Sequence, residues 1–174
     1  MSDLIATVSY VLRGGPARWD SFVAAIPEDL LRLAPAPEEW SAVECLQHLI
    51  DVEVVFAARS VLIREGKDLV SFDPATEGEV GSVVPDIQGL LAQFRASRAK
   101  SLDMLAGLKE EELERTANHE QFGSVSLQEL LNEWAGHDLM HMVQAEQPVM
   151  QPFIAGCGKW RGFFACHDVL AKST

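Results

Sequence analysis

The chain has 174 residues and a mass of 19.1 kDa, and 48% of its residues are apolar, which suits a single globular domain over residues 1–174. Acidic residues outnumber basic ones by 26 to 14, and the net charge of −12 argues against binding to the phosphate backbone of nucleic acid. Three cysteines are too few, and odd in number, for a disulfide framework. We therefore expect a cytoplasmic protein. Neither a basic, apolar leader nor an apolar run of ~18 residues occurs, so we also expect no membrane partner.

Apolar residues at helical spacing predict two helices in the first part of the chain. The first, from residue 4 to about residue 26, is expected to break or kink at Gly14-Gly15-Pro16. The second has a clear start, because Ser41 and Glu44 have the spacing of a capping box. It runs to about residue 65 and is expected to end at Gly66.

The same spacing predicts two further helices after a long connection over residues 66–84. The third covers about residues 85–108, and residues 109–125 form a connection with one helical turn. The fourth opens with a second capping box, Ser126 and Glu129, and is expected to end near residue 146 because Pro148 follows. No strand pattern of length appears. The fold class is therefore an all-α four-helix bundle with a long crossover connection, parallel second and third helices, and an aromatic C-terminal tail docked on it.

Three of the five histidines lie on apolar helix faces. His137 and His141 are four residues apart, so a helix presents both on one face. His48 lies on the apolar face of the second predicted helix. Two facing helices could bring the three imidazoles together in the core, where they would bind a divalent metal. The alternative is three separate core histidines, each hydrogen-bonded to a backbone carbonyl, and spacing alone leaves both interpretations open.

The segment from His137 to His141 is similar to the His-Glu-x-x-His pattern of zinc peptidases, with Asp138 in place of the glutamate that acts as general base. Aspartate is shorter, and no typical third-ligand motif follows, so we do not expect a peptidase. Asp138 is instead a candidate catalytic residue that handles protons or supports the site, with a simple salt bridge as the alternative.

Two windows of the sequence resemble the motifs of the DinB-like (YfiT-like) bundle proteins. Residues 40–53 are similar to the first motif, with Trp-Ser at the start, then glutamate, histidine and Asp-x-Glu. Residues 134–144 are similar to the second, and residues 119–127 and 152–164 resemble flanking segments. The resemblance spans about residues 2–165.

The resemblance implies a four-helix bundle, often a homodimer, with a three-histidine site for nickel or zinc. It carries the ligand role onto His48, His137 and His141. Some members of the family are transferases or isomerases that use a low-molecular-weight thiol, others are regarded as hydrolases, and many have no known reaction.

We therefore expect a metal-dependent enzyme that carries out thiol-dependent transfer or isomerisation on a small molecule. The alternatives are hydrolysis by water activated at the metal, and binding without turnover. A thiol cofactor with carboxylates needs a basic residue near the site, and Arg161, with Arg59 as a second candidate, is expected to bind it.

Weaker expectations concern five other residues. Asp51 and Gln144 could lie near the site as polar supports, and Cys45 is expected to be an apolar filler. His119 and His167 are expected to face solvent.

Overall fold

The fold is a bundle of four long helices, confirming the predicted class. The computed structural model describes residues 3–36, 39–71 and 86–169. The bundle consists of α1 (Leu4–Ala25), α3 (Ala42–Glu65), α5 (Ile87–Ala106) and α6 (Leu127–Gly156). A short helix, α2 (Glu28–Leu31), follows α1, one 3₁₀ turn covers Glu110–Glu112, and a longer 3₁₀ helix covers Gly158–Phe164.

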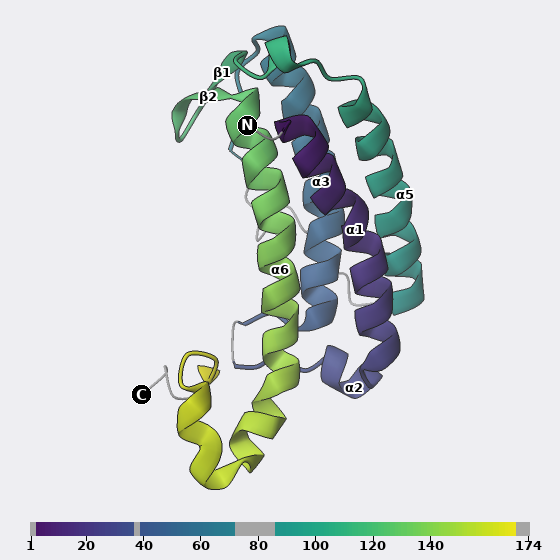
Figure 1. Cartoon of the computed structure of the whole chain (residues 1–174), viewed down its shortest axis with the longest axis vertical. Coiled ribbons are helices and arrows are strands. Elements are labelled where there is room, and N and C mark those ends of the chain that lie inside the picture. Colours follow the sequence, from purple (N-terminus) through teal and green to yellow (C-terminus); the bar gives the residue numbers. More distant parts are fainter. Residues whose placement is uncertain (1–2, 37–38, 72–85, 170–174) are drawn as a thin grey trace.

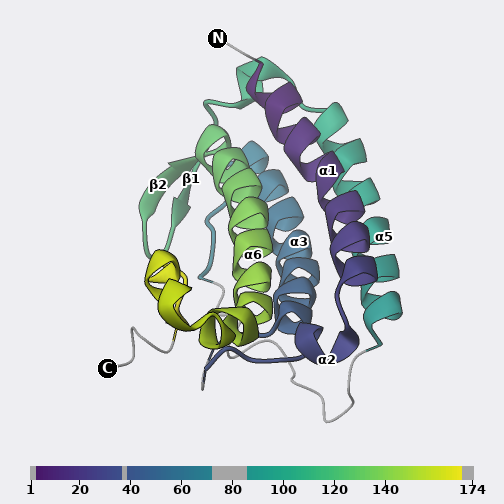
Figure 2. The same ribbon diagram turned by 60° about the horizontal axis from the view of Figure 1, so that its bottom comes forward.

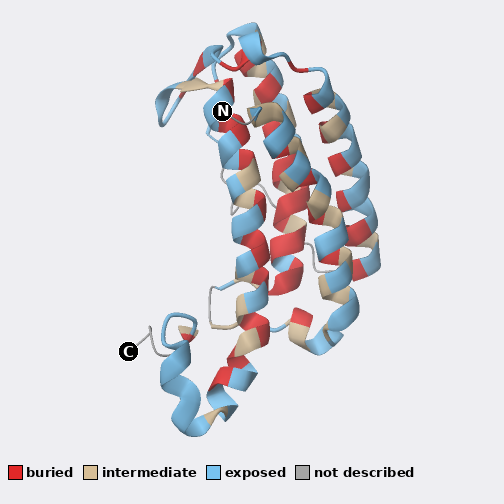
Figure 3. Ribbon diagram, viewed as in Figure 1, coloured by how far each residue is buried: buried red, intermediate tan, exposed pale blue. Residues whose placement is uncertain are grey.

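The helices pack as a four-sided bundle in which α3 and α1 each contact both α5 and α6. Figure 1 shows that α3 and α5 run in the same direction, as predicted, and that α1 and α6 run in the opposite direction. Most of the predicted 66–84 connection lies outside the described residues. The buried residues lie on the facing sides of the helices (Figure 3) and form one hydrophobic core. Among the described residues, no helix has the length and hydropathy that crossing a membrane requires.

Both predicted capping boxes are present. The Ser41 hydroxyl accepts a hydrogen bond from the Glu44 backbone N–H, and the Glu44 carboxylate accepts one from the Ser41 backbone N–H at 2.7 Å. Ser126 and Glu129 form the same reciprocal pair at the start of α6. Gly66 ends α3 in the left-handed region, with φ of 67°, where a glycine avoids the strain of a Cβ. Local hydrogen bonding thus sets the starts of the two helices that carry the candidate ligands.

Of the predicted break or kink in the first helix, the break is wrong, because α1 continues through Pro16. A proline inside a helix lacks the N–H that would bond the carbonyl four residues earlier, here that of Leu12. The Nη1 atom of Arg98 on α5 donates a hydrogen bond to this carbonyl at 2.8 Å. The tertiary contact therefore satisfies the acceptor that the proline leaves free.

The predicted end of the fourth helix near residue 146 is also wrong. Helix α6 continues to Gly156 with Pro148 and Pro152 inside it, and Figure 1 shows its axis bending in the last turns. Val149 and Ile154 are buried in this part of the helix. Their burial favours continued helix despite the backbone hydrogen bonds that two prolines remove.

A two-stranded hairpin, β1 (Thr116–His119) and β2 (Gly123–Ser126), lies in the connection where the sequence predicted no strand. The predicted helical turn is present as the 3₁₀ turn before it. Leu69 pairs with the hairpin through hydrogen bonds to Asn118 and Glu120. His119 is only 4% exposed, so the expectation that it faces solvent is wrong. The reason is that Leu69 and the hairpin cover it, which helical spacing could not indicate.

The C-terminal tail folds back on the side of α6 that faces away from α1 (Figures 1 and 2). The Gln151 side chain docks it by donating to the His167 carbonyl and accepting from the Val169 N–H. The aromatic residues of the tail do not enter the core, since Trp160 is 67% exposed and Phe163 is 79% exposed. The tail therefore docks through polar contacts and leaves these two rings exposed, and His167 is exposed as expected.

Candidate metal centre

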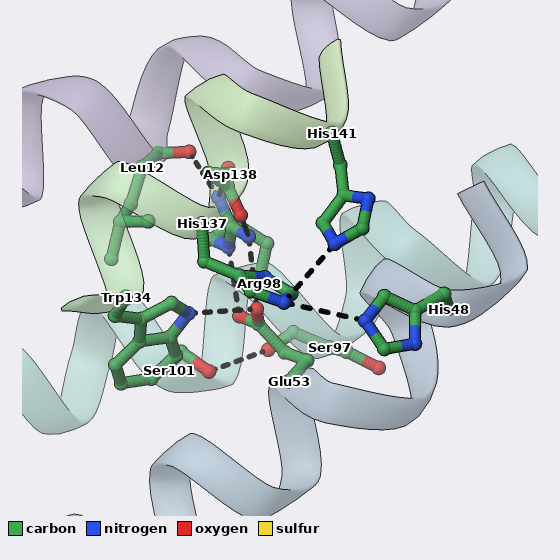
Figure 4. A network of polar contacts seen from close by, with 10 residues as sticks. All are labelled: Leu12, His48, Glu53, Ser97, Arg98, Ser101, Trp134, His137, Asp138 and His141. Atoms are coloured by element: carbon green, nitrogen blue, oxygen red, sulfur yellow. Dashed lines mark hydrogen bonds and ion pairs between the residues drawn. The ribbon is translucent and has the colours of Figure 1, made fainter. Parts of the chain in front are cut away.

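Three histidines from two helices meet inside the bundle (Figure 4). The Nε2 atom of His137 on α6 lies 3.3 Å from Nε2 of His48 on α3 and 3.1 Å from Nε2 of His141. The possible ligand atoms of all three residues lie within 4.8 Å of one another. The structure thus brings together the three histidines that the sequence selected.

The spacing of these nitrogen atoms fits a metal ion. Zinc–nitrogen bonds of 2.0–2.1 Å in a tetrahedral site place neighbouring ligand atoms about 3.3–3.4 Å apart. The observed distances of 3.1 and 3.3 Å are close to that edge. Hydrogen bonding cannot satisfy all three of these nitrogen atoms. The Nε2 atom of a neutral His137 carries either one lone pair or one N–H, whereas the Nε2 atoms of His48 and His141 both lie within hydrogen-bond distance of it. A cation would accept a lone pair from each of the three rings.

The surroundings hold the imidazoles in the neutral form that metal binding requires. Burial, with the neighbouring histidines as a second cause, lowers the pKa of His48 to about 4 and that of His137 to about 3. Burial also lowers the pKa of His141, which the side chain of Gln144 opposes. The buried Nδ1 atoms of His137 and His141 have no hydrogen-bond partner among the described residues.

Two aromatic rings pack against the three histidines. Trp40 lies 4.7 Å from the His48 ring and stacks on His141 at 5.7 Å with an interplanar angle of 17°. The Phe56 ring approaches His137 edge-on at 5.5 Å. Trp40 immediately precedes the capping box, so the start of α3 places both this ring and His48. An apolar wall of this kind limits water and strengthens electrostatic interactions at the site.

A buried ionic group, which we call the Arg98 cluster, consists of Arg98, Glu53 and Asp138 and adjoins the histidines (Figure 4). Arg98 donates to the two Glu53 oxygens at 2.7 and 2.9 Å and to the two Asp138 oxygens at 2.7 and 2.8 Å. Trp134 Nε1 also donates to Glu53. The three charged residues are 1%, 2% and 7% exposed, respectively.

The Arg98 cluster was not predicted, although two signals for it are visible in the sequence. Arg98 occupies a core position in an otherwise apolar stripe of the third predicted helix, and Glu53 does the same on the second. A buried charge needs a partner of opposite sign, so two such positions on facing helices indicate an ion pair.

Asp138 forms the salt bridge that the sequence analysis held as the alternative to a catalytic role. Its hydrogen bonds are to Arg98, and its Oδ2 atom also lies where a Cβ on Gly15 would clash. Burial raises the pKa of Asp138, while the hydrogen bonds from Arg98 oppose that rise. Through these hydrogen bonds, Asp138 joins α6 to Arg98 on α5 at the position directly after His137.

The two arginines considered for cofactor binding have other partners. Arg161 lies in the tail and pairs with Asp168, with Nε 2.6 Å from the carboxylate. Arg59 contacts the Val70 carbonyl and His119, each at 3.3 Å. None of the hydrogen bonds and ion pairs found among the described residues links either arginine to the three histidines.

The remaining candidates have modest roles. Asp51 accepts a hydrogen bond from Gln47 at 3.0 Å, and burial raises its pKa. Cys45 is fully buried, and burial raises the pKa of its thiol to about 12, consistent with an apolar filler.

Comparisons with known proteins agree with this architecture. YfiT from Bacillus subtilis, described as a probable metal-dependent hydrolase with an unusual four-helix bundle topology, has a similar fold with a TM-score of 0.75. It is 18% identical, and the match covers 85% of this chain and 87% of YfiT. A conserved protein from Enterococcus faecalis matches with a TM-score of 0.65 and 20% identity, over 86% of this chain and 97% of the other. No curated protein matches the sequence. The model of the DinB superfamily matches residues 12–145, and this chain therefore belongs to the DinB superfamily.

Proposed function

We propose that this protein is a metal-dependent enzyme that acts on a small molecule, with His48, His137 and His141 as ligands of a divalent ion. The observation that carries the proposal is the convergence of three neutral imidazoles, with Nε2 separations of 3.1 and 3.3 Å, inside an aromatic wall. Three histidine ligands suit zinc or nickel and leave coordination positions open for a substrate or water. When bound, such an ion supplies Lewis-acid activation of water or of a substrate group.

Hydrolysis is the reaction that we favour. The description of YfiT as a probable metal-dependent hydrolase supports it, as that protein has a similar bundle. Thiol-dependent transfer, which the sequence motifs suggest, needs a basic residue at the site for the acidic groups of the thiol. Arg161 and Arg59 are engaged by Asp168 and His119 instead. Transfer is therefore the second candidate, and binding without turnover is the third.

The metal site is tested by removing its ligands. We expect purified protein to hold about one equivalent of zinc or nickel by elemental analysis, and the variant His137→Ala/His141→Ala to lose it. His167→Ala is the matched control, because this histidine is exposed in the tail and should leave the metal content unchanged. Unchanged metal in the double variant would refute the assignment.

The reaction is tested on the metal-loaded protein. Turnover of activated esters or amides that disappears with a chelator and returns with metal supports hydrolysis. A change in the absorption spectrum of the cobalt-substituted protein on adding a thiol, together with thiol consumption, supports transfer. If neither result is obtained, binding without turnover remains as the function.

Asp138→Asn separates the two roles of that residue. Normal metal content with an altered pH dependence of turnover would support proton handling by Asp138, whereas loss of metal would support its structural role. We further propose a homodimer, which light scattering of the purified protein would test.

A further inference from the structure

Arg98 joins all four long helices of the bundle at one point. It lies on α5, which contributes none of the three histidines, and is 1% exposed. Its guanidinium donates to Glu53 on α3, to Asp138 on α6 and to the Leu12 carbonyl on α1. These contacts use all five of its N–H groups, which is the full donor capacity of an arginine side chain.

The partners of Arg98 are close in the chain to the candidate metal ligands. Asp138 directly follows His137 on α6, and Glu53 lies five residues after His48 on α3, a rise of about 7.5 Å along the helix. Trp134, one turn before His137, also donates to Glu53 at 3.2 Å. The ionic contacts therefore link α3 to α6 directly beside His137 and within about 7.5 Å, along α3, of His48.

We propose that Arg98 is a positioning residue for the metal site: by joining Glu53 to Asp138, it holds α3 and α6 at the separation at which the three Nε2 atoms can share one ion. This inference rests on the proposed metal-dependent function. Ligand atoms must be held to within a fraction of an ångström for strong binding, and bidentate contacts to both carboxylates give that precision.

The charge of the cluster supports the same role. Both oxygens of each carboxylate accept from Arg98, so two carboxylates share one guanidinium. A divalent cation on the histidines would place further positive charge beside this pair of carboxylates, so metal and cluster would stabilise each other.

The Arg98 cluster is tightly packed against α1. A Cβ built on Gly15 would lie 2.9 Å from Asp138 Oδ2 and 3.1 Å from Arg98 Nη1. The carbonyl that Pro16 leaves free accepts from the same Nη1. Helix α1 therefore packs against the guanidinium and also accepts a hydrogen bond from it.

The test compares Arg98→Lys with Arg95→Lys in the metal-loaded protein. Lysine keeps the positive charge but cannot make the bidentate contacts. Arg95 lies on the same helix but is exposed and pairs with Asp20, so its replacement is the matched control. We expect Arg98→Lys to weaken zinc binding about 10–100-fold, the range found for residues that support metal ligands, in competition with a chromogenic chelator. We also expect an altered absorption spectrum of bound cobalt, and no change for Arg95→Lys.

A purely structural role is separated by a second comparison. Leu105→Ala removes a fully buried side chain elsewhere on α5 and should lower stability without changing the cobalt spectrum. If Arg98→Lys does not fold, Glu53→Gln, which keeps the side-chain shape and removes the charge, should show the same loss of affinity. Wild-type affinity and spectrum in the folded Arg98 or Glu53 variant would overturn this inference alone. Absence of metal binding in the wild type would overturn the proposed function as well.

Discussion

Replacing Gly15 by alanine gives the sharpest test of the packing around the Arg98 cluster. The neighbouring Gly14 provides an internal control, because a Cβ there would have no heavy atom within 4 Å. Both residues lie inside α1, so both substitutions gain helix propensity of roughly 1 kcal/mol. Any difference between the two variants therefore reports the environment of the added methyl group.

The cost at Gly15 follows from the distances. The new Cβ would lie 2.9 Å from the Asp138 Oδ2 atom, so the carboxylate, the guanidinium or the helix must move. Overpacking of this kind costs about 1–3 kcal/mol. Weakening one hydrogen bond of a charged pair adds about 1.5–3 kcal/mol. After the gain in helix propensity, we expect Gly15→Ala to destabilise the protein by about 1.5–5 kcal/mol and Gly14→Ala to stabilise it by up to about 1 kcal/mol.

Urea unfolding followed by far-ultraviolet circular dichroism measures both values on metal-free protein. The two variants should have the same denaturant dependence and differ only in midpoint. A Gly15→Ala protein as stable as Gly14→Ala would refute the reasoning. It would mean that α1 does not press against the Arg98–Asp138 pair.

Three further predictions concern buried groups. Arg98→Met leaves two buried carboxylates without their partner, so the free energy of unfolding should fall by about 3–5 kcal/mol in the same urea assay. A loss below ~1 kcal/mol would contradict the buried ion pairs. In the folded protein the pKa values of His48 and His137 are lowered from 6.5 to about 4 and about 3. As the pH falls, these histidines therefore bind protons in the unfolded chain before they do so in the folded one, which favours unfolding. The stability of metal-free protein should therefore be complete above about pH 6.5 and decline toward pH 4, and a flat profile in unfolding measurements across this range would contradict the buried neutral rings. Burial raises the thiol pKa of Cys45 to about 12, so Cys45 should resist a thiol reagent at mildly alkaline pH while the exposed Cys166 reacts. Mass spectrometry of the labelled folded protein measures both reactions. Rapid labelling of Cys45 would contradict its burial in a closed core.

Local features of the sequence predicted most of the fold correctly. The capping boxes at Ser41 and Ser126 determine where α3 and α6 begin, because both hydrogen-bonding partners lie within three residues. Helical spacing predicted that His137 and His141 share a face, and the apolar stripe around His48 predicted that it points into the core. The identity of the three converging histidines was therefore accessible without a structure.

Contacts between distant segments decided what the sequence could not show. Arg98 meets Glu53 and Asp138, which are 45 and 40 residues away in the chain, and no local pattern specifies such a pairing. Helix α1 continues through Pro16 because the partner of the freed carbonyl is supplied by α5. Which side chains can form the site follows from residue type and helical period, and both are visible in the sequence. How the site is held depends on hydrogen bonds and charges that meet across four helices, and these appear only in the folded chain.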